Sequence, residues 1–321
     1  KAFSCKEIYR IVLSEGLDVE VVSGGELYTA LQAGVPGSQI HFQGNNKSAG
    51  ELTMAVENGV GDIVVDNLYE LERLNAIAGE HSMVAPISFR IKPGIDAHTH
   101  EFIRTGQVDS KFGLDLASGE AMEALRRAKT MEHVAVKGLH CHIGSQILEK
   151  APFVHAAEVM LQFYAKVRDE LGMAFEHLNL GGGFGIHYTA QDDAIPYEEY
   201  MEDVSAMVHS TCEKLDLELP RIYIEPGRSI VGEAGITLYT VGSIKEIPGV
   251  RTYVAIDGGM FDNPRYALYQ SAYTCCIANK ASQPADFTAT IAGKCCESGD
   301  LIQEHTLIQK PEEGDILAVL S

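Results

Sequence analysis

The sequence predicts a (β/α)8 barrel followed by a small β domain, and three observations support this prediction. Strand patterns and helix patterns alternate at close spacing up to about residue 235, which is typical of parallel strands joined by crossover helices. Polar residues and glycines stand where several of these strands end. Beyond residue 235 the helix patterns stop, and β-branched runs separated by Pro and Gly take over. The predicted domains are therefore residues 1–235 and residues 236–321.

Each strand of the barrel is predicted from a short apolar or β-branched run, and each helix from apolar residues at helical spacing. The predicted strands are 19–22, 40–42, 63–65, 86–91, 136–142, 177–180 and 221–225. The predicted helices are 8–15, 24–33, 48–58, 68–78, 120–131, 154–171 and 197–217. A doubly wound sheet also fits this alternation. A barrel needs eight strands, and the first helix has no strand in front of it, so we expect a first barrel strand upstream that ends at Lys1.

In the predicted β domain, the strands are 236–241, 252–256 and 287–291, and we expect this domain to be truncated at its C-terminal end.

The amino-acid composition argues against some classes of partner and indicates a cellular compartment. The 321 residues carry a formal net charge of −20, which argues against nucleic acid or an anionic membrane surface as a partner. An odd number of scattered cysteines argues against a disulfide framework and favours a reducing compartment, the cytoplasm by default.

The run 177–185 (His-Leu-Asn-Leu-Gly-Gly-Gly-Phe-Gly) indicates a binding site for an anion. A strand pattern ends in three glycines, and a helix pattern follows. Glycines at such a place let the main chain approach a ligand closely and turn its N–H groups outward. Strand, glycines and helix together favour a phosphate. The alternative interpretation of the glycines is a flexible turn.

Reactive side chains stand at the ends of other predicted strands. The residues at or just beyond these ends are Lys1, Ser23, Asn45, Asp66, Arg90 with Lys92, His142, Gly181 and Glu225. In a (β/α)8 barrel the carboxyl ends of the strands converge on the face that carries the chemistry. A lysine, a histidine, a phosphate site and a carboxylate are therefore expected at one mouth.

Five runs, in this order, resemble the fold-type III pyridoxal-phosphate-dependent decarboxylases, and among them the enzymes that act on diaminopimelate. The runs are 21–26 (VVSGGE), 140–146 (HCHIGSQ), 181–185 (GGGFG), 225–228 (EPGR) and 296–300 (CESGD). The resemblance implies a barrel with a β-sandwich-like domain and a homodimer whose active sites are shared across the interface. It also implies decarboxylation of meso-diaminopimelate to L-lysine and CO2, the last step of lysine biosynthesis.

The resemblance implies a role for each residue at the mouth. Decarboxylation leaves a carbanion, and pyridoxal 5'-phosphate serves as the electron sink. Lys1, in the segment Lys1-Ala2, corresponds to the lysine that binds the cofactor covalently. Glu225 corresponds to the partner of the pyridine nitrogen, and His142 to the histidine that lies against the ring face.

By the same resemblance, the phosphate is held by Ser145, Gly227, Arg228 and the glycines 181–183, through hydroxyl, guanidinium and backbone N–H groups. Arg228 is open to contact with a substrate carboxylate as well.

Substrate residues are implied in the β domain. Arg265 and Tyr269 match the Arg-x-x-x-Tyr element that receives the far end of diaminopimelate, where a cation is needed for the distal carboxylate. Cys296 resembles the proton donor that the partner subunit delivers, and Glu297 the residue that meets the distal amino group. The alternative for Cys296 is a small core residue.

Other interpretations remain open at this point. His140 and His142 lie on the same face of a strand, which would suit a metal, but no third ligand with a recognisable spacing is found, and we predict no metal. The substrate could instead be arginine or a carboxylated polyamine. A catalytically silent relative that binds a partner protein is the third interpretation.

Three features depart from the resemblance or extend it. Glu20 stands where the family usually has aspartate. A C-terminal segment with a tyrosine that reaches the cofactor and substrate is expected beyond Ser321. Residues 98–111 resemble an active-site lid, with 110–113 (Ser-Lys-Phe-Gly) at its base.

Overall fold

The computed structural model describes residues 1–95 and 110–321, which form two compact units. The first unit contains Lys1–Gly185 and Ile195–Arg228, and the second contains Ile186–Ala194 and Ser229–Ser321. The second unit therefore includes a segment that the sequence analysis placed within residues 1–235. The predicted part 98–109 of the lid lies outside the described residues. None of the helices in the described ranges combines the length and the apolar character that crossing a membrane requires.

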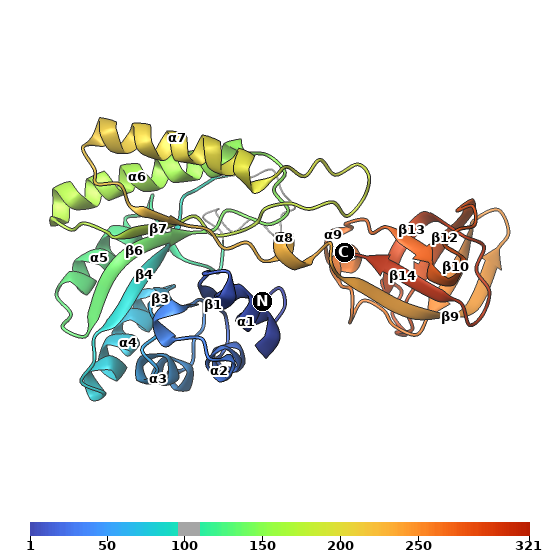
Figure 1. Cartoon of the computed structure of the whole chain (residues 1–321), viewed down its shortest axis with the longest axis horizontal. Coiled ribbons are helices and arrows are strands. Elements are labelled where there is room, and N and C mark those ends of the chain that lie inside the picture. Colours follow the sequence, from blue (N-terminus) through green and yellow to red (C-terminus); the bar gives the residue numbers. More distant parts are fainter. Residues whose placement is uncertain (96–109) are drawn as a thin grey trace. The chain divides into compact units, whose positions relative to one another are not determined.

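The first unit is a curled parallel sheet covered by helices (Figure 1). Its strands are β1 (Val19–Val21), β2 (Ile40–Phe42), β3 (Asp62–Val65), β4 (Ala85–Lys92), β5 (Leu114–Asp115), β6 (Val134–Cys141), β7 (His177–Asn179) and β8 (Arg221–Tyr223). Its helices are α1 (Lys6–Ser14), α2 (Gly24–Ala33), η1 (Gly37–Gln39), α3 (Ala49–Glu57), α4 (Leu68–Glu80), α5 (Glu120–Lys129), α6 (Ala151–Leu171) and α7 (Tyr197–Leu215). The short helix α8 (Arg228–Val231) begins at the last residue of this unit.

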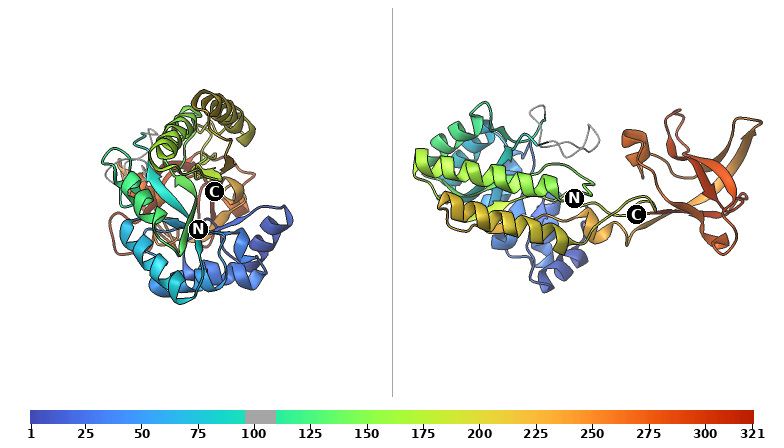
Figure 2. Two further views of the ribbon diagram at one scale, coloured as in Figure 1. Left: turned by 90° about the vertical axis from the view of Figure 1, so that its left-hand side faces the viewer. Right: turned by 90° about the horizontal axis from the view of Figure 1, so that it is seen from above.

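The strand order decides between the two folds that fit the alternation. The sheet runs β1-β2-β3-β4-β6-β7-β8 in chain order, and β5 pairs with β4. Chain order is the order of a barrel, whereas a doubly wound sheet reverses direction at a switch point. The left view of Figure 2 shows the sheet curling with the helices outside it. The predicted barrel-type α/β fold is confirmed.

Apolar residues of the helices form the core on the outer side of this sheet. On α6, the Phe153 ring stacks on the Phe184 ring at a centroid distance of 4.7 Å, and Tyr200 of α7 meets both rings edge-on. These three side chains are almost completely buried. The packing of α6 and α7 thus covers the segment that follows the glycines 181–183, which fixes the position of that loop from behind.

The second unit is one six-stranded sheet, with strand order β11-β14-β9-β10-β12-β13. Its elements are β9 (Ile236–Ile247), β10 (Arg251–Ile256), α9 (Arg265–Tyr269), β11 (Cys275–Ile277), η3 (Ala278–Lys280), β12 (Phe287–Ala292), β13 (Leu301–Ile308) and β14 (Ile316–Leu320). Neighbouring strands are antiparallel except β10 and β12. The sheet wraps around its own core, to which Ile186 and Tyr188 contribute. A separate β domain, as predicted, therefore follows the barrel-type unit.

Candidate active site

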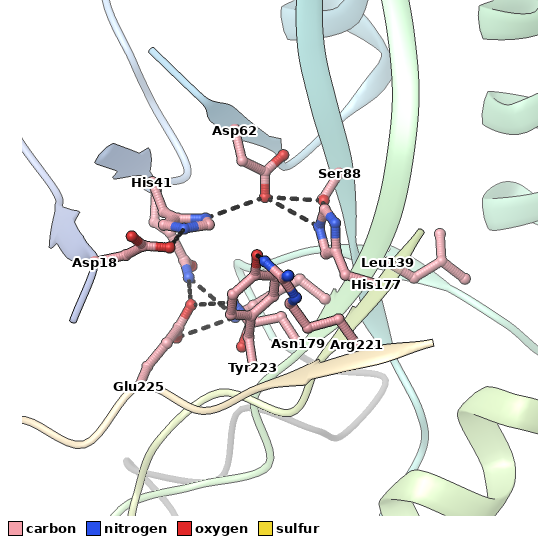
Figure 3. Close-up of polar contacts among 12 residues, drawn as sticks. Asp18, His41, Asp62, Ser88, Leu139, His177, Asn179, Arg221, Tyr223 and Glu225 are labelled. Carbon is pink, nitrogen blue, oxygen red and sulfur yellow. Dashed lines mark hydrogen bonds and ion pairs between the residues drawn. The ribbon is translucent and has the colours of Figure 1, made fainter. Parts of the chain in front are cut away.

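Glu225, two residues beyond β8, is the centre of the polar site inside the curled sheet (Figure 3). Its carboxylate accepts hydrogen bonds from Asn179 Nδ2 at 2.7 Å and from Gln43 Nε2. The His140 Nε2 atom lies 3.2 Å from the second carboxylate oxygen and 3.0 Å from Gln43 Nε2. Partners from three other strand ends thus fix the orientation of this carboxylate.

A second carboxyl group, that of Glu20 in β1, shares these surroundings. Burial and the charge of Glu225 raise the pKa of Glu20 to about 8, and Glu20 is hydrogen-bonded to Glu225. Burial also raises the pKa of Glu225, while the hydrogen bonds from Glu20 and Asn179 act in the opposite direction. Two carboxyl groups this close do not ionise independently, so one proton is retained by the pair at neutral pH.

The two histidines of β6 and its C-terminal end are neutral. Burial lowers the pKa of His140 to about 3, and the charge of Arg90 acts in the same direction. Burial, followed by the charges of Arg90 and Lys1, lowers the pKa of His142 well below its ordinary value. The neutral His142 ring accepts a hydrogen bond at Nδ1 from the Gly182 N–H group at 3.3 Å. His142 therefore lies directly against the glycine loop.

The glycines 181–183 are required by the geometry of this loop. Gly181 and Gly183 have φ values of 71° and 104°, in the left-handed region that favours glycine. A Cβ atom on Gly182 would come within 2.1 Å of the Glu225 carbonyl oxygen, and one on Gly183 within 2.2 Å of the Gly144 carbonyl oxygen. Main chain thus packs on main chain here, as in a loop that holds a phosphate through its N–H groups.

Ser145 and Arg228 meet at the same loop. The Arg228 Nη2 atom donates to Ser145 Oγ at 2.8 Å. Gly227 packs closely against the segment Lys1-Ala2, since a Cβ atom on it would lie 3.1 Å from the Ala2 Cβ atom. The structure therefore brings together the segment of Lys1, the glycine loop, Ser145 and the run 225–228.

Lys1 lies at the exposed rim of the first unit. Its backbone nitrogen lies 2.7 Å from Glu26 Oε1. Burial raises the pKa of Glu20 and lowers that of His142, and the charge of Lys1 opposes the first shift and adds to the second, so this charge acts on the interior of the site.

Several residues of the site were not predicted as members of it. They are Gln43, His140 and Asn179, whereas Arg90, which was predicted at the end of its strand, acts on the pKa of Glu225 through its charge. Asn45 was predicted at the end of the strand 40–42, whereas Gln43 is the residue that reaches Glu225. The alternation of side chains along a strand could have indicated two of them, because residues two positions apart lie on the same face. His140 stands two residues before His142, and Asn179 stands two residues before Gly181.

A second polar cluster fills the sheet interior toward the start of the strands (Figure 3). Asp62 Oδ2 lies 3.6 Å from His41 Nδ1 and 3.5 Å from His177 Nε2, and it accepts a hydrogen bond from Ser88 Oγ at 2.9 Å. Although burial lowers the pKa of His41, hydrogen bonds and charge from Asp62 and Asp18 raise it to about 9. His41 is therefore charged beneath the site.

No group of three or more side chains able to hold a metal ion occurs in residues 1–95 and 110–321. His140 Nε2 faces Gln43 Nε2 and Glu225 Oε2.

At the base of the predicted lid, the Arg90 guanidinium lies over the Phe112 ring, 4.2 Å from the ring centroid.

The predicted substrate residues lie in the second unit. Arg265 begins the helix α9 and Tyr269 ends it. The Arg265 guanidinium lies 3.8 Å above the ring of Tyr188. Cys296 is an exposed free thiol, and the neighbouring Glu297 accepts a hydrogen bond from Gly299 N at 3.4 Å.

Comparisons with known proteins agree with this geometry. Residues 1–232 match the family model "Pyridoxal-dependent decarboxylase, pyridoxal binding domain". The chain is 50% identical over 319 residues to a diaminopimelate decarboxylase of Bacillus subtilis, covering 99% of this chain and 73% of that one.

Solved structures are similar as well. A diaminopimelate decarboxylase from M. jannaschii in complex with L-lysine superposes with a TM-score of 0.87 at 36% identity, covering 98% of this chain and 71% of that one. One from Helicobacter pylori, also with L-lysine, gives a TM-score of 0.86 at 30% identity and covers 98% of this chain and 76% of that one. The chain therefore belongs to the pyridoxal-dependent decarboxylases, the family that includes these diaminopimelate decarboxylases.

Proposed function

We propose that the chain is a pyridoxal-phosphate-dependent decarboxylase that converts meso-diaminopimelate to L-lysine and CO2. The observation that carries this proposal is the setting of Glu225, a carboxylate oriented by three strand-end partners beside a neutral histidine and a glycine loop. The similarity to enzymes that are named for diaminopimelate supports the substrate. Because the product of the proposed reaction is L-lysine itself, we place the reaction at the end of lysine biosynthesis.

The residues present fit the cofactor. A phosphate needs main chain that it can approach closely without side chains in front of it, and the loop 181–183 leaves no room for a Cβ atom on any of its glycines. A protonated ring nitrogen needs a fixed carboxylate, and Glu225 is fixed by Asn179, Gln43 and His140. When bound, pyridoxal phosphate supplies an aromatic ring that accepts the electron pair released as CO2 leaves.

In this proposal, four residues of the chain position the cofactor ring and hold it in the site. The amine of Lys1 holds the cofactor covalently. The Glu225 carboxylate keeps a proton on the ring nitrogen. His142 packs against the ring as a neutral group, because its lowered pKa prevents a charge there that would oppose the ring's own charge. Gly227 leaves space for the Lys1-Ala2 segment.

Ser145, Arg228 and the glycine loop hold the phosphate. The hydrogen bond between Arg228 and Ser145 supports a phosphate role for this arginine over a role at the substrate carboxylate, because it directs the guanidinium to a hydroxyl beside the loop.

For the substrate, Arg265 and Tyr269 receive the distal carboxylate and Glu297 the distal amino group. Cys296 provides the proton that replaces the departing carboxylate. Its exposure supports the proposal that it serves the active site of a second copy in a homodimer. The seven free cysteines support a reducing compartment, for which the cytoplasm is the proposed location.

The test uses the cofactor-loaded protein with meso-diaminopimelate and product analysis by mass spectrometry. We expect L-lysine and CO2 in equal amounts, and no product from arginine or a carboxylated polyamine. Borohydride reduction followed by peptide mapping should place the cofactor on Lys1. Glu225→Gln should reduce the rate by orders of magnitude, whereas Glu233→Gln, on the exposed surface, should not. Absence of cofactor absorption would instead favour a catalytically silent binding protein.

A further inference from the structure

Arg265, the proposed contact for the distal carboxylate, is held from one side by an aromatic ring. The centre of its guanidinium lies 3.8 Å from the centroid of the Tyr188 ring. At this distance the cation is attracted to the ring face. Tyr188 is 7% exposed, so the contact takes place largely out of water, where the attraction is strongest.

Tyr188 is itself fixed within the second unit. Its backbone N–H donates to Asp192 Oδ2 at 3.0 Å, and its carbonyl oxygen accepts from Thr274 Oγ1 at 2.8 Å. The ring of Tyr273, also buried, meets the Tyr188 ring edge-on at a centroid distance of 6.0 Å. The ring beneath the guanidinium therefore has little freedom to rotate away.

The helix that carries Arg265 is anchored independently of the guanidinium. Tyr266 Oη donates to Glu304 in β13, and Tyr273, four residues beyond the end of α9, donates through its backbone N–H to Gln303 Oε1 at 2.9 Å. Just before α9, Asn263 Nδ2 donates to Tyr239 Oη at 2.8 Å. These contacts hold the backbone of α9. The Tyr188 ring then orients the Arg265 side chain.

Stacking and carboxylate binding use different parts of an arginine. A ring contacts the flat face of the guanidinium, whereas a carboxylate is bound by the N–H groups along its edge. The two contacts therefore do not compete. A side chain that is already oriented loses less conformational entropy when the ligand arrives.

We propose that Tyr188 is a specificity-positioning residue, whose ring presets the Arg265 guanidinium to receive a carboxylate at the distal end of the substrate. This inference rests on the proposed function. It also gives a role to the segment 186–194, which directly follows the glycine loop in sequence but packs in the second unit.

The experiment compares two ligands that differ in a single carboxylate. L-lysine keeps the distal amino-acid head, and 1,5-diaminopentane has an amine in its place and no carboxylate. Their dissociation constants are measured by calorimetry on the cofactor-loaded, full-length protein, for the wild type, Tyr188→Leu and Tyr188→Phe. Leu317→Ala removes a fully buried side chain from the core of the same unit. It tests whether a loss of stability in this unit is enough to change the ligand affinities.

We expect Tyr188→Leu to weaken L-lysine binding about fivefold to thirtyfold, as loss of a desolvated cation–π contact implies, and to leave the affinity for 1,5-diaminopentane unchanged. Tyr188→Phe keeps the ring and should behave as the wild type. Leu317→Ala should lower the unfolding temperature without changing the ratio of the two affinities.

Two results would overturn the inference. If the wild type prefers L-lysine but Tyr188→Leu keeps the same preference, the positioning role is wrong and the proposed function stands. If the wild type itself does not distinguish the two ligands, the distal carboxylate contact of the proposed function is wrong, and the inference falls with it.

Discussion

Glu20→Gln removes one of the two carboxyl groups of the active site and keeps a side chain of similar size that can still donate a hydrogen bond to Glu225. We expect this variant to be more stable than the wild type at neutral and alkaline pH, and equally stable in acid. The reason is that the wild-type chain must keep a proton on Glu20 in order to fold around Glu225.

The sign and size of the effect follow from the pKa of Glu20, which burial and the charge of Glu225 raise from 4.5 to about 8. Below pH 4.5 the carboxyl is protonated in both states, and its contribution to stability is complete. As the pH rises through 8, the unfolded chain has already released the proton that the folded chain holds, so the contribution is lost. At about 1.36 kcal/mol per pH unit over this interval, the loss reaches at most about 5 kcal/mol.

The assay is urea unfolding of the cofactor-free protein between pH 4 and pH 9, followed by circular dichroism. The difference in the free energy of unfolding between Glu20→Gln and wild type should rise from near zero at pH 4 to a few kcal/mol at pH 8. Glu15→Gln, at the exposed end of α1, serves as the matched control. A difference that is flat across this range, or a variant that is less stable at pH 8, would refute the reasoning.

Three further predictions concern other parts of the chain. Arg265→Ala should raise the KM for diaminopimelate by roughly 30-fold or more, because losing a charged contact in a closed site costs about 2–5 kcal/mol; an unchanged KM would remove the assignment. Gly182→Ala places a Cβ atom 2.1 Å from a carbonyl oxygen and should weaken cofactor binding, measured by fluorescence titration, whereas Gly50→Ala meets nothing within 4 Å and should not. Asp62→Asn leaves the charge of His41 without its buried partner and should lower the free energy of unfolding by about 3–5 kcal/mol at pH 6. Because the pKa of His41 is raised to about 9, this deficit should shrink as the pH rises through 9, and a constant deficit would contradict the ion pair.

Most of the first unit could be predicted from the sequence because each element carries its own pattern. The helix Gly24–Ala33 and the strand Ile40–Phe42 have the bounds that were predicted, and other elements differ by a few residues. Parallel strands buried on both faces give continuous apolar runs. The barrel order then follows from the regular alternation with helices.

The second unit was predicted less completely, and its strands β11, β13 and β14 were missed. In β13, Glu304 makes a hydrogen bond to Tyr266, so a polar residue stands two positions after the buried Ile302, where an alternating pattern would require an apolar one. Register shifts between β12 and β13 disturb the alternation further. Sequence periodicity cannot show such irregular pairing, because it comes from contacts distant in sequence.

For the site, most of the predicted residues stand beyond a strand end, whereas Gln43, His140 and Asn179, which stand within or just at the strands, were missed. Glu225 and the glycine loop follow their strands directly and stand out against an apolar run. Gln43 and Asn179 reach the site only because the sheet curls and turns one face of each strand inward. That curvature is a property of the assembled sheet.

The charges inside the curled sheet are arranged in two sets. Toward the start of the strands, His41 and Asp62 offset each other. Toward the ends, Arg90 acts on both Asp66 and Glu225, while the histidines are neutral and Glu20 keeps its proton at neutral pH. Among Arg90, Asp66, Glu225, Glu20 and the two histidines, one negative charge, that of Glu225, then remains in excess. A single protonated ring nitrogen would neutralise it, whereas a second ionised carboxylate at Glu20 would leave the site with a charge that no single cation could satisfy. A protonated Glu20 would therefore match the site to a ring that carries a single positive charge.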